Sequence, residues 1–136
     1  MQQEKITGGC LCQSVRYEAD HQPVDTGYCH CRMCQRALGN VFGTWAAFRL
    51  EGFRYLKGKP RWYRSSDIAE RCFCDNCGSP IAYLPEGSEV LYVWLGTLDH
   101  AYAYKPQKHY HIEGRIPWAD QQIDLPVGPT TYEMSG

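Results

Sequence analysis

The sequence lacks the features that mark several broad classes of protein. No run of about 18 apolar residues is present, so we expect no membrane-spanning segment. Neither sign of charge dominates, because 14 basic and 15 acidic residues give a net charge of -1. That balance provides no broad electrostatic footprint for nucleic acid. With no internal repeat or low-complexity linker either, we expect one domain over residues 1–136 that binds neither nucleic acid nor membrane.

The N-terminal segment lacks an apolar stretch that would resemble a secretion signal. It reads Met1-Gln2-Gln3-Glu4-Lys5, so we expect a cytoplasmic, reducing location in which thiols stay free. Aromatic residues are plentiful instead, with 4 Trp, 10 Tyr and 4 Phe. Together with evenly spread glycine and proline, this composition favours a compact, β-rich domain.

Eight cysteines are the most informative residues, and seven of them fall into short groups. The groups are Cys10-x-Cys12, Cys29-x-Cys31-x2-Cys34 and Cys74-x2-Cys77, with Cys72 close to the last pair. Thiols one or two residues apart converge readily on one metal ion and rarely bridge to each other. A disulfide framework would require an oxidising compartment, and a redox CxxC would require a βαβ pattern that is absent. We therefore interpret the groups as zinc ligands.

The number of thiols predicts how they divide between two zinc ions. A structural zinc takes four protein ligands, whereas a catalytic zinc keeps three and leaves one position for water or substrate. Residues 74–78 (CDNCG) have the form of a zinc knuckle that Gly78 closes with a positive φ. Cys10 and Cys12 can supply the second pair of a four-cysteine structural site. Backbone amides and the nearby Arg71 could offset its negative charge.

Cys29, Cys31 and Cys34 form the second predicted site, which has no obvious fourth cysteine unless Cys72 comes close. Three thiolates leave a bound zinc with a net negative formal charge. Such a zinc is a mild Lewis acid, better suited to holding an incoming thiol as a thiolate than to ionising water. His30 lies between two of these cysteines and should point away from their shared centre, so ligation, contact with a ligand and a surface position all stay open.

Short apolar, aromatic or β-branched stretches predict a series of strands. They cover residues 15–17, 41–48, 68–73, 80–84 and 90–98. The last is the most apolar stretch and is the expected central strand. The third and fourth should flank the knuckle, which gives the arrangement strand, knuckle, strand.

Other local signals predict a hairpin and one turn of helix. A Lys-Gly-Lys-Pro turn separates residues 53–56 from residues 61–64 and predicts that these two runs pair. Residues 29–38 should contain a tight turn and one helical turn that ends at Gly39, a residue suited to a left-handed cap.

The C-terminal part is polar, aromatic and rich in proline. We expect an edge strand at residues 109–112 and a wrapping tail at residues 117–126. His109 and His111 should project from the same side of that strand. They are interpreted either as a structural pair or as a base or substrate contact.

The motifs resemble the signature of the glutathione-dependent formaldehyde-activating enzyme family, also called the centromere protein V family. The similar stretches are Gly8-Gly9-Cys10-x-Cys12 with Val15-Arg16-Tyr17, Cys29-His30-Cys31-x2-Cys34, Phe73-Cys74-x2-Cys77-Gly78-Ser79-Pro80, and His109-x-His111-Ile112 with Pro117-Trp118, in order over residues 6–126. The resemblance implies a mainly β fold with antiparallel sheets of the tent-like zinc-binding type. It also implies a structural zinc on Cys10, Cys12, Cys74 and Cys77, and a catalytic zinc on Cys29, Cys31 and Cys34.

The resemblance further implies a carbon–sulfur lyase that joins formaldehyde reversibly to glutathione, giving S-(hydroxymethyl)glutathione. The partners expected are thus a small-molecule thiol and an aldehyde, and Arg32 or Arg36 could contact a glutathione carboxylate. Two other functions stay open: a zinc-scaffolded binding or chaperone module without catalysis, and the same chemistry on another thiol or aldehyde. Cys72 lies outside the family pattern and is expected to be a small buried hydrophobe.

Overall fold

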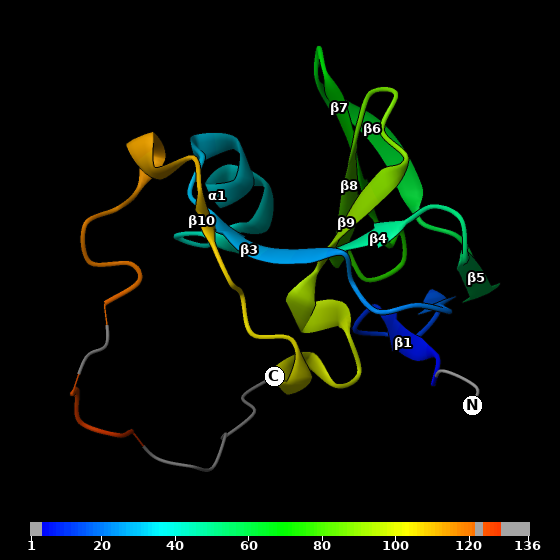
Figure 1. Ribbon diagram of the computed structural model, residues 1–136, viewed down its shortest axis with the longest axis horizontal. Helices are drawn as coiled ribbons and strands as arrows, with labels where there is room; N and C mark the ends of the chain where they lie inside the picture. Colours follow the sequence, from blue (N-terminus) through cyan, green and yellow to red (C-terminus); the bar gives the residue numbers. More distant parts are fainter. Residues whose placement is uncertain (1–3, 122–123, 129–136) are drawn as a thin grey trace.

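The computed structural model describes residues 4–121 and 124–128, which form two β-sheets and one short α-helix (Figure 1). This confirms the expected mainly β fold class. None of the helices in the described ranges is long and apolar enough to cross a membrane. In chain order the elements are β1 (Ile6–Gly9), β2 (Arg16–Ala19), β3 (Asp25–Cys29), α1 (Arg32–Leu38), β4 (Gly43–Arg49), β5 (Phe53–Lys57), β6 (Arg61–Ser66), β7 (Ala69–Phe73), β8 (Pro80–Pro85), β9 (Val90–Trp94), the 3-10 helices η1 (Leu95–Thr97) and η2 (Ala101–Ala103), β10 (His109–Tyr110) and the 3-10 helix η3 (Ile112–Gly114).

The larger sheet has seven strands in the order β10-β3-β4-β9-β8-β7-β6, and the smaller has three in the order β1-β2-β5. Neighbouring strands are antiparallel except β10, which runs parallel to β3. β9 lies in the middle of the larger sheet, as its apolar sequence predicts. It ends at Trp94 instead of Leu98 because η1 follows at once, with the Thr97 hydroxyl donating to the Trp94 carbonyl oxygen at 2.8 Å.

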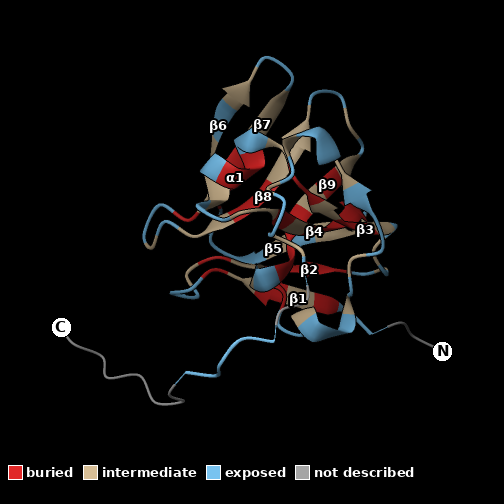
Figure 2. Ribbon diagram, turned by 90° about the vertical axis from the view of Figure 1, so that its left-hand side faces the viewer, coloured by how far each residue is buried: buried red, intermediate tan, exposed pale blue. Residues whose placement is uncertain are grey.

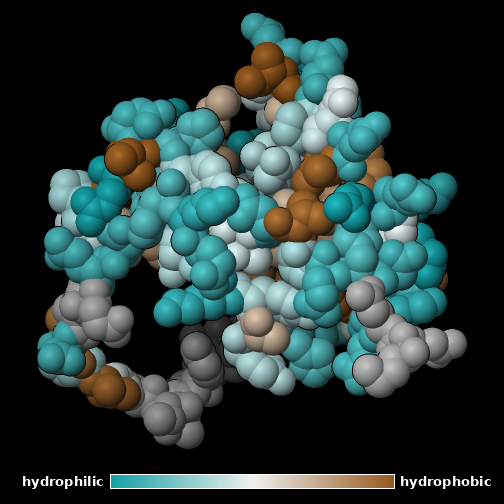
Figure 3. Space-filling view, in the orientation of Figure 1, coloured by the Kyte–Doolittle hydropathy of each residue, from teal (hydrophilic) through white to brown (hydrophobic). Residues whose placement is uncertain are grey.

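The main core lies between the two sheets (Figure 2). Tyr17 of β2 is fully buried there, its ring stacks on Phe53 at 5.1 Å, and its hydroxyl forms a hydrogen bond with Thr97 at 2.6 Å. Phe48 and Leu91 of the larger sheet belong to the same buried cluster. Burying each side chain of this size contributes about 1.5–3 kcal/mol. The surface in Figure 3 is mostly hydrophilic, with its apolar residues in small patches.

The helix α1 covers part of the other face of the larger sheet. It begins after Cys31, whose sulfur accepts a hydrogen bond from the backbone N–H of Cys34 at 3.3 Å, as an N-cap residue does. It ends at Gly39, which has a left-handed conformation with φ 62°. The predicted end at Gly39 is confirmed, and the helix is longer than one turn. A second apolar cluster lies beneath it, with Trp45 and Trp94 among its buried members.

The predicted hairpin at residues 53–64 is wrong, although both runs are strands. β5 pairs with β2 in the smaller sheet, whereas β6 pairs with β7 in the larger one. Gly58 has a φ of 60° at the turn signal, and there the chain passes from one sheet to the other. Packing favours this pairing, because beside β2 the ring of Phe53 stacks on the buried ring of Tyr17.

The arrangement of strand, knuckle and strand is confirmed, since β7 and β8 flank the knuckle and pair antiparallel. The C-terminal part differs more from the prediction than these strands do. β10 is an edge strand as predicted but contains only His109–Tyr110. Residues 124–128 are exposed and extend away from the sheets in Figure 1, so wrapping is wrong for them. Gln122 and Ile123, also in the predicted tail, lie outside the described residues.

Candidate metal centres

Seven cysteines meet at two separate places, in the groups that their spacing predicts. One place gathers Cys10, Cys12, Cys74 and Cys77, and the other gathers Cys29, Cys31 and Cys34. A tetrahedral zinc with Zn–S bonds of about 2.3 Å holds its sulfurs about 3.8 Å apart. Within the two clusters, the hydrogen-bonded Sγ atoms are separated by 3.6, 3.8, 3.4 and 3.1 Å. Both clusters therefore fit a zinc ion.

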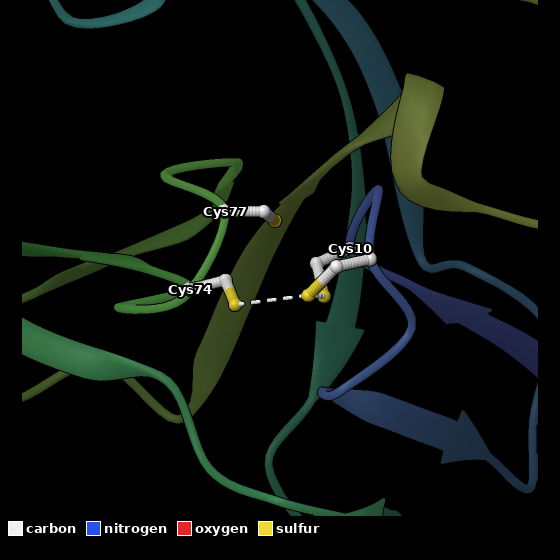
Figure 4. Close-up of side chains that lie close together, drawn as sticks. Cys10, Cys74 and Cys77 are labelled. Carbon is white, nitrogen blue, oxygen red and sulfur yellow. Dashed lines mark hydrogen bonds between the residues drawn. The ribbon is translucent and has the colours of Figure 1, made fainter.

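The four-cysteine cluster connects the two sheets. One pair comes from the loop after β1 of the smaller sheet, and the other from the knuckle between β7 and β8 of the larger sheet (Figure 4). Gly78 closes the knuckle with φ 80°, as predicted, and its N–H donates to the Cys74 carbonyl oxygen at 2.7 Å. The backbone N–H of Leu11 donates to the Ser79 hydroxyl at 3.1 Å and joins the two loops directly.

Hydrogen-bond donors around this cluster favour thiolates. Ser14 lies 2.9 Å from the sulfur of Cys12, and the Asn76 amide donates to the same sulfur at 3.2 Å. These bonds, Ser14 first, lower the pKa of Cys12 to about 7. The Ser79 hydroxyl, 3.1 Å from the sulfur of Cys77, lowers the pKa of that thiol to about 5. Deprotonated sulfur is the form that binds metal.

The three-cysteine cluster forms where β3 meets α1. Cys29 is the last residue of β3, Cys31 caps the helix, and Cys34 lies in its first turn. Within the described residues, no fourth metal-ligating side chain joins the three sulfurs. Cys72 lies instead in the core between the sheets, 2% exposed, where burial raises its pKa to about 12. This position agrees with the expectation that Cys72 is a small buried hydrophobe.

Arg71 contacts the three-cysteine cluster, so its predicted role at the four-cysteine site is wrong. Its Nη2 donates to the sulfur of Cys34 at 3.6 Å. The side chain reaches this cluster because Arg71 pairs with Tyr83, whose ring lies 5.3 Å from the guanidinium carbon on the face toward α1. A hydrogen bond from Cys29 and the charge of Arg71 lower the pKa of Cys34 to about 5. The same bond raises the pKa of Cys29.

His30 points away from the three sulfurs, as predicted, and does not join their group. It is fully buried, and its Nε2 lies 2.9 Å from Nδ1 of His109. Burial lowers the pKa of His30. His109 stacks on Tyr28 at 4.9 Å and lies 3.6 Å from a carboxylate oxygen of Asp120.

His111 does not share the side of the strand that His109 occupies, so that prediction is wrong. Its backbone has φ 57°, a left-handed conformation that ends the strand and redirects the side chain. His111 lines a cavity of about 150 Å³ beside Cys29, whereas His109 contacts His30. The remaining lining residues are Asp25, Trp45, Tyr83, Tyr92 and Tyr110.

Aromatic rings give this cavity most of its walls. Trp45 and Tyr92 meet edge to face at 4.8 Å, and Tyr92 stacks on Tyr83 at 4.8 Å. The hydroxyl of Tyr110 donates a hydrogen bond to the carboxylate of Asp25 at 2.6 Å. This bond raises the pKa of Tyr110 to about 12. No spacing in the sequence points to these residues, because β3, β4, β8, β9 and β10 bring them together.

Arg32 and Arg36, for which contact with a substrate carboxylate and an exposed position were both open, are exposed on α1. They line an open groove of about 330 Å³ with Asn40 and Ile116. Arg32 donates a short hydrogen bond to the side chain of Gln35. The structure brings neither arginine into the cavity beside Cys29.

Comparison with known proteins identifies a family that the chain matches. Residues 5–114 match the family described as glutathione-dependent formaldehyde-activating enzyme. An uncharacterized lyase of Schizosaccharomyces pombe is 28% identical over 76 residues, which cover 56% of this chain and 55% of that protein. The chain thus matches about half the length of this curated relative. A crystal structure of a Rhodobacter sphaeroides protein is 20% identical, with a TM-score of 0.58 over 76% of this chain and 99% of that one, and it shows a shared fold.

Proposed function

Because the chain belongs to the glutathione-dependent formaldehyde-activating enzyme family, we propose that it is a zinc-dependent carbon–sulfur lyase that adds a thiol to a small aldehyde. The thiol proposed is glutathione and the aldehyde is formaldehyde, as the family description suggests. The observation that carries the proposal is the cluster of Cys29, Cys31 and Cys34, which has three converging sulfurs and no fourth ligand among the described residues. We assign the four-cysteine cluster to a structural zinc.

The reaction forms one carbon–sulfur bond. The thiol loses its proton, its sulfur attacks the aldehyde carbon, the carbonyl π bond breaks, and the oxygen takes up a proton. The reverse sequence is the lyase direction. Cys29, Cys31 and Cys34 would hold the zinc ion, which as a Lewis acid would favour the thiolate form of the incoming thiol.

The residues around the cluster have separate parts in this proposal. Together with the hydrogen bond from Cys29, Arg71 favours the anionic, metal-binding form of Cys34. Trp45 and Tyr92 exclude water from the side of Cys29 that faces the cavity. A small, aromatic-walled space strengthens electrostatic interactions with the reacting sulfur and oxygen.

Cys31→Ser provides the direct test. Serine keeps the N-cap of α1, because its hydroxyl accepts the same hydrogen bond from the Cys34 N–H, so the fold should survive. We expect about two zincs per wild-type chain and about one in the variant. Turnover of glutathione with formaldehyde should fall at least about 100-fold, since one ligand of the catalytic ion is lost. Mass spectrometry of the native protein and a thiol-dependent aldehyde assay measure both quantities.

Met33→Ala is the matched control, because Met33 lies on the same turn of α1, is 51% exposed and belongs to neither cluster, so zinc content and turnover should stay intact. Wild-type turnover in Cys31→Ser would rule out the proposed site. A wild-type protein that binds one zinc and turns over no thiol and aldehyde pair would support the alternative of a zinc-scaffolded binding module.

A further inference from the structure

His30, His109 and Asp120 form a third group of potential metal ligands, separate from both cysteine clusters. Nε2 of His30 lies 2.9 Å from Nδ1 of His109, and that nitrogen lies 3.6 Å from Oδ2 of Asp120. One ligand atom of each residue lies within 4.8 Å of the other two. Imidazole nitrogens suit zinc, copper, iron and nickel, and zinc also accepts carboxylate oxygen.

The spacing of these atoms is close to that around a bound cation. Two ligands that are about 2.0–2.1 Å from a zinc ion, at angles of about 90° to 109°, lie about 2.9–3.4 Å apart. The two nitrogens already have this separation, whereas the carboxylate must approach them. Asp120 lies in a turn after η3, outside both sheets, so a shift of its side chain does not disturb the core.

The two histidines are held in place by their neighbours. The N–H of His30 donates to the Tyr110 carbonyl oxygen at 3.0 Å, and the His30 carbonyl oxygen accepts a hydrogen bond from the Gln35 side chain at 2.8 Å. Nδ1 of His30 is buried and has no hydrogen-bond partner among the described residues, so Nε2 is the nitrogen that acts on a neighbour. The ring of Tyr28 stacks on His109 at 4.9 Å. Ligands that are ordered in advance lose little freedom when they bind.

Arg115 orients the carboxylate of Asp120. Its Nε donates to Oδ1 at 2.8 Å, whereas the other oxygen, Oδ2, is the one 3.6 Å from His109. Carboxylates that bind a metal are in turn hydrogen-bonded by neighbouring groups, and Arg115 makes such a bond here. The positive charge of Arg115 also repels a nearby cation, so we expect weaker binding than at the thiolate clusters.

We propose that His30, His109 and Asp120 bind a divalent transition-metal ion, such as zinc, at a third site. The proposal does not depend on the lyase activity. The side chain of His109 is 45% exposed, which gives an ion access from solvent. His30 lies between Cys29 and Cys31, whereas the other two ligands belong to β10 and to the segment after η3. The bound ion therefore fastens residues 109–120 to the loop that carries the three-cysteine cluster.

Zinc titration of the native protein, without a histidine tag, tests the number of sites. The cysteine clusters are filled first and free metal is removed by gel filtration. Isothermal titration calorimetry should then show one further zinc per wild-type chain. Should the third ion survive gel filtration, native mass spectrometry would count about three zincs in wild type.

Two variants make this titration specific. His109→Gln should weaken the further binding at least about 10-fold, because the loss of an outer partner of a ligand alone costs about 10- to 100-fold. This variant should fold, since His109 is partly exposed. His100→Gln makes the same change at an exposed position outside the group and should bind like wild type. Equal binding by His109→Gln and wild type would overturn the site.

Cobalt(II), added to protein whose cysteine clusters hold zinc, reports which atoms bind the further ion. We expect visible d–d absorption without the near-ultraviolet charge-transfer bands that thiolate ligands give. The absorption should be weaker in His109→Gln and in Asp120→Asn than in wild type. Charge-transfer bands would place the cobalt on cysteine sulfur and overturn the proposal. Failure of both metals to bind further would also overturn it, because the histidines would then share only a hydrogen bond.

Hydrogen exchange measures the fastening. The further zinc should slow amide exchange in residues 109–120 of wild type and of His100→Gln, and should leave His109→Gln unchanged. Unchanged exchange in wild type at saturating zinc would overturn the fastening. None of these readouts requires turnover of a substrate, so a failure of the proposed lyase activity leaves this test intact.

Discussion

Arg16 and Asp99 join two segments that lie 83 residues apart in the chain. The guanidinium donates two hydrogen bonds to the carboxylate, at 2.9 and 2.5 Å, and the Thr7 hydroxyl donates a third at 2.6 Å. These contacts, with Arg16 as the first cause, lower the pKa of Asp99 to about 2. A single carboxylate therefore connects strand β2 to the segment after η1.

We expect Asp99→Asn to lower the free energy of unfolding by about 1 kcal/mol at pH 7. The pair stabilises the fold fully above the pKa of the unfolded carboxyl, about 3.9, and its contribution is lost as pH falls through about 2. The value is modest because the Asp99 side chain is 34% exposed and water screens the pair. Urea unfolding at several pH values, at equal zinc content, should show the difference from wild type shrinking below about pH 4.

Asp67→Asn, at an exposed turn position, is the control for this experiment and should change stability little at any pH. A difference between Asp99→Asn and wild type that stayed constant from pH 7 to pH 2 would contradict the assignment of the pair.

At the scale of elements, the packing of β3 against its neighbours depends on Gly27, which has no side chain. A Cβ atom at Gly27 would lie 2.8 Å from Trp45 on β4 and 2.8 Å from the ring of Tyr110 on β10. Both rings line the cavity beside Cys29. The glycine thus allows two cavity walls to approach the strand that carries the first cysteine of the site.

Gly27→Ala should therefore destabilise the protein by about 1–3 kcal/mol, as overpacking of a close contact does. The displaced rings should also change the near-ultraviolet circular dichroism of the native state. Gly96→Ala is the matched control, because nothing lies within 4 Å of its Cβ position, and it should change stability by less than about 0.5 kcal/mol. Equal effects of the two changes would show that the close approach at Gly27 does not affect stability.

Patterns among neighbouring residues predicted which segments are strands or helix better than they predicted which strands pair with each other. The strands β7, β8 and β9, the cap at Gly39 and the grouping of seven cysteines all follow from neighbouring residues. The pairing of β5 with β2 does not, because the packing of Phe53 on Tyr17 decides it. The site divides in the same way, since spacing predicts the sulfurs, whereas contacts between distant segments bring Arg71 to Cys34.

At the scale of the whole molecule, the four-cysteine cluster is a link between the two sheets. Cys12 follows β1 of the smaller sheet, and Cys74 and Cys77 lie between β7 and β8 of the larger one. Cys12 is itself exposed, so replacing it should remove one proposed zinc ligand and leave the packing of the core unchanged. The three-cysteine cluster, by contrast, lies at β3 and α1 on the other face of the larger sheet.

We expect Cys12→Ser to lower the free energy of unfolding by at least about 3 kcal/mol, a part of the roughly 10 kcal/mol that zinc provides in zinc-finger peptides. Cys31→Ser should cost clearly less, although each variant loses one zinc. Thermal unfolding of both variants, with and without a chelator, measures this. If chelation lowered the melting temperature of Cys12→Ser as much as that of wild type, the four-cysteine cluster would not be the stabilising one.

The position of β10 has a consequence for biosynthesis. Every cysteine precedes residue 78, whereas Tyr110 and His111 complete the cavity from the far end of the described chain, beside β3. During synthesis the sulfurs of both cysteine clusters are therefore made well before the residues that form the last wall of this cavity. We therefore expect a nascent chain to be able to hold zinc before the cavity is complete.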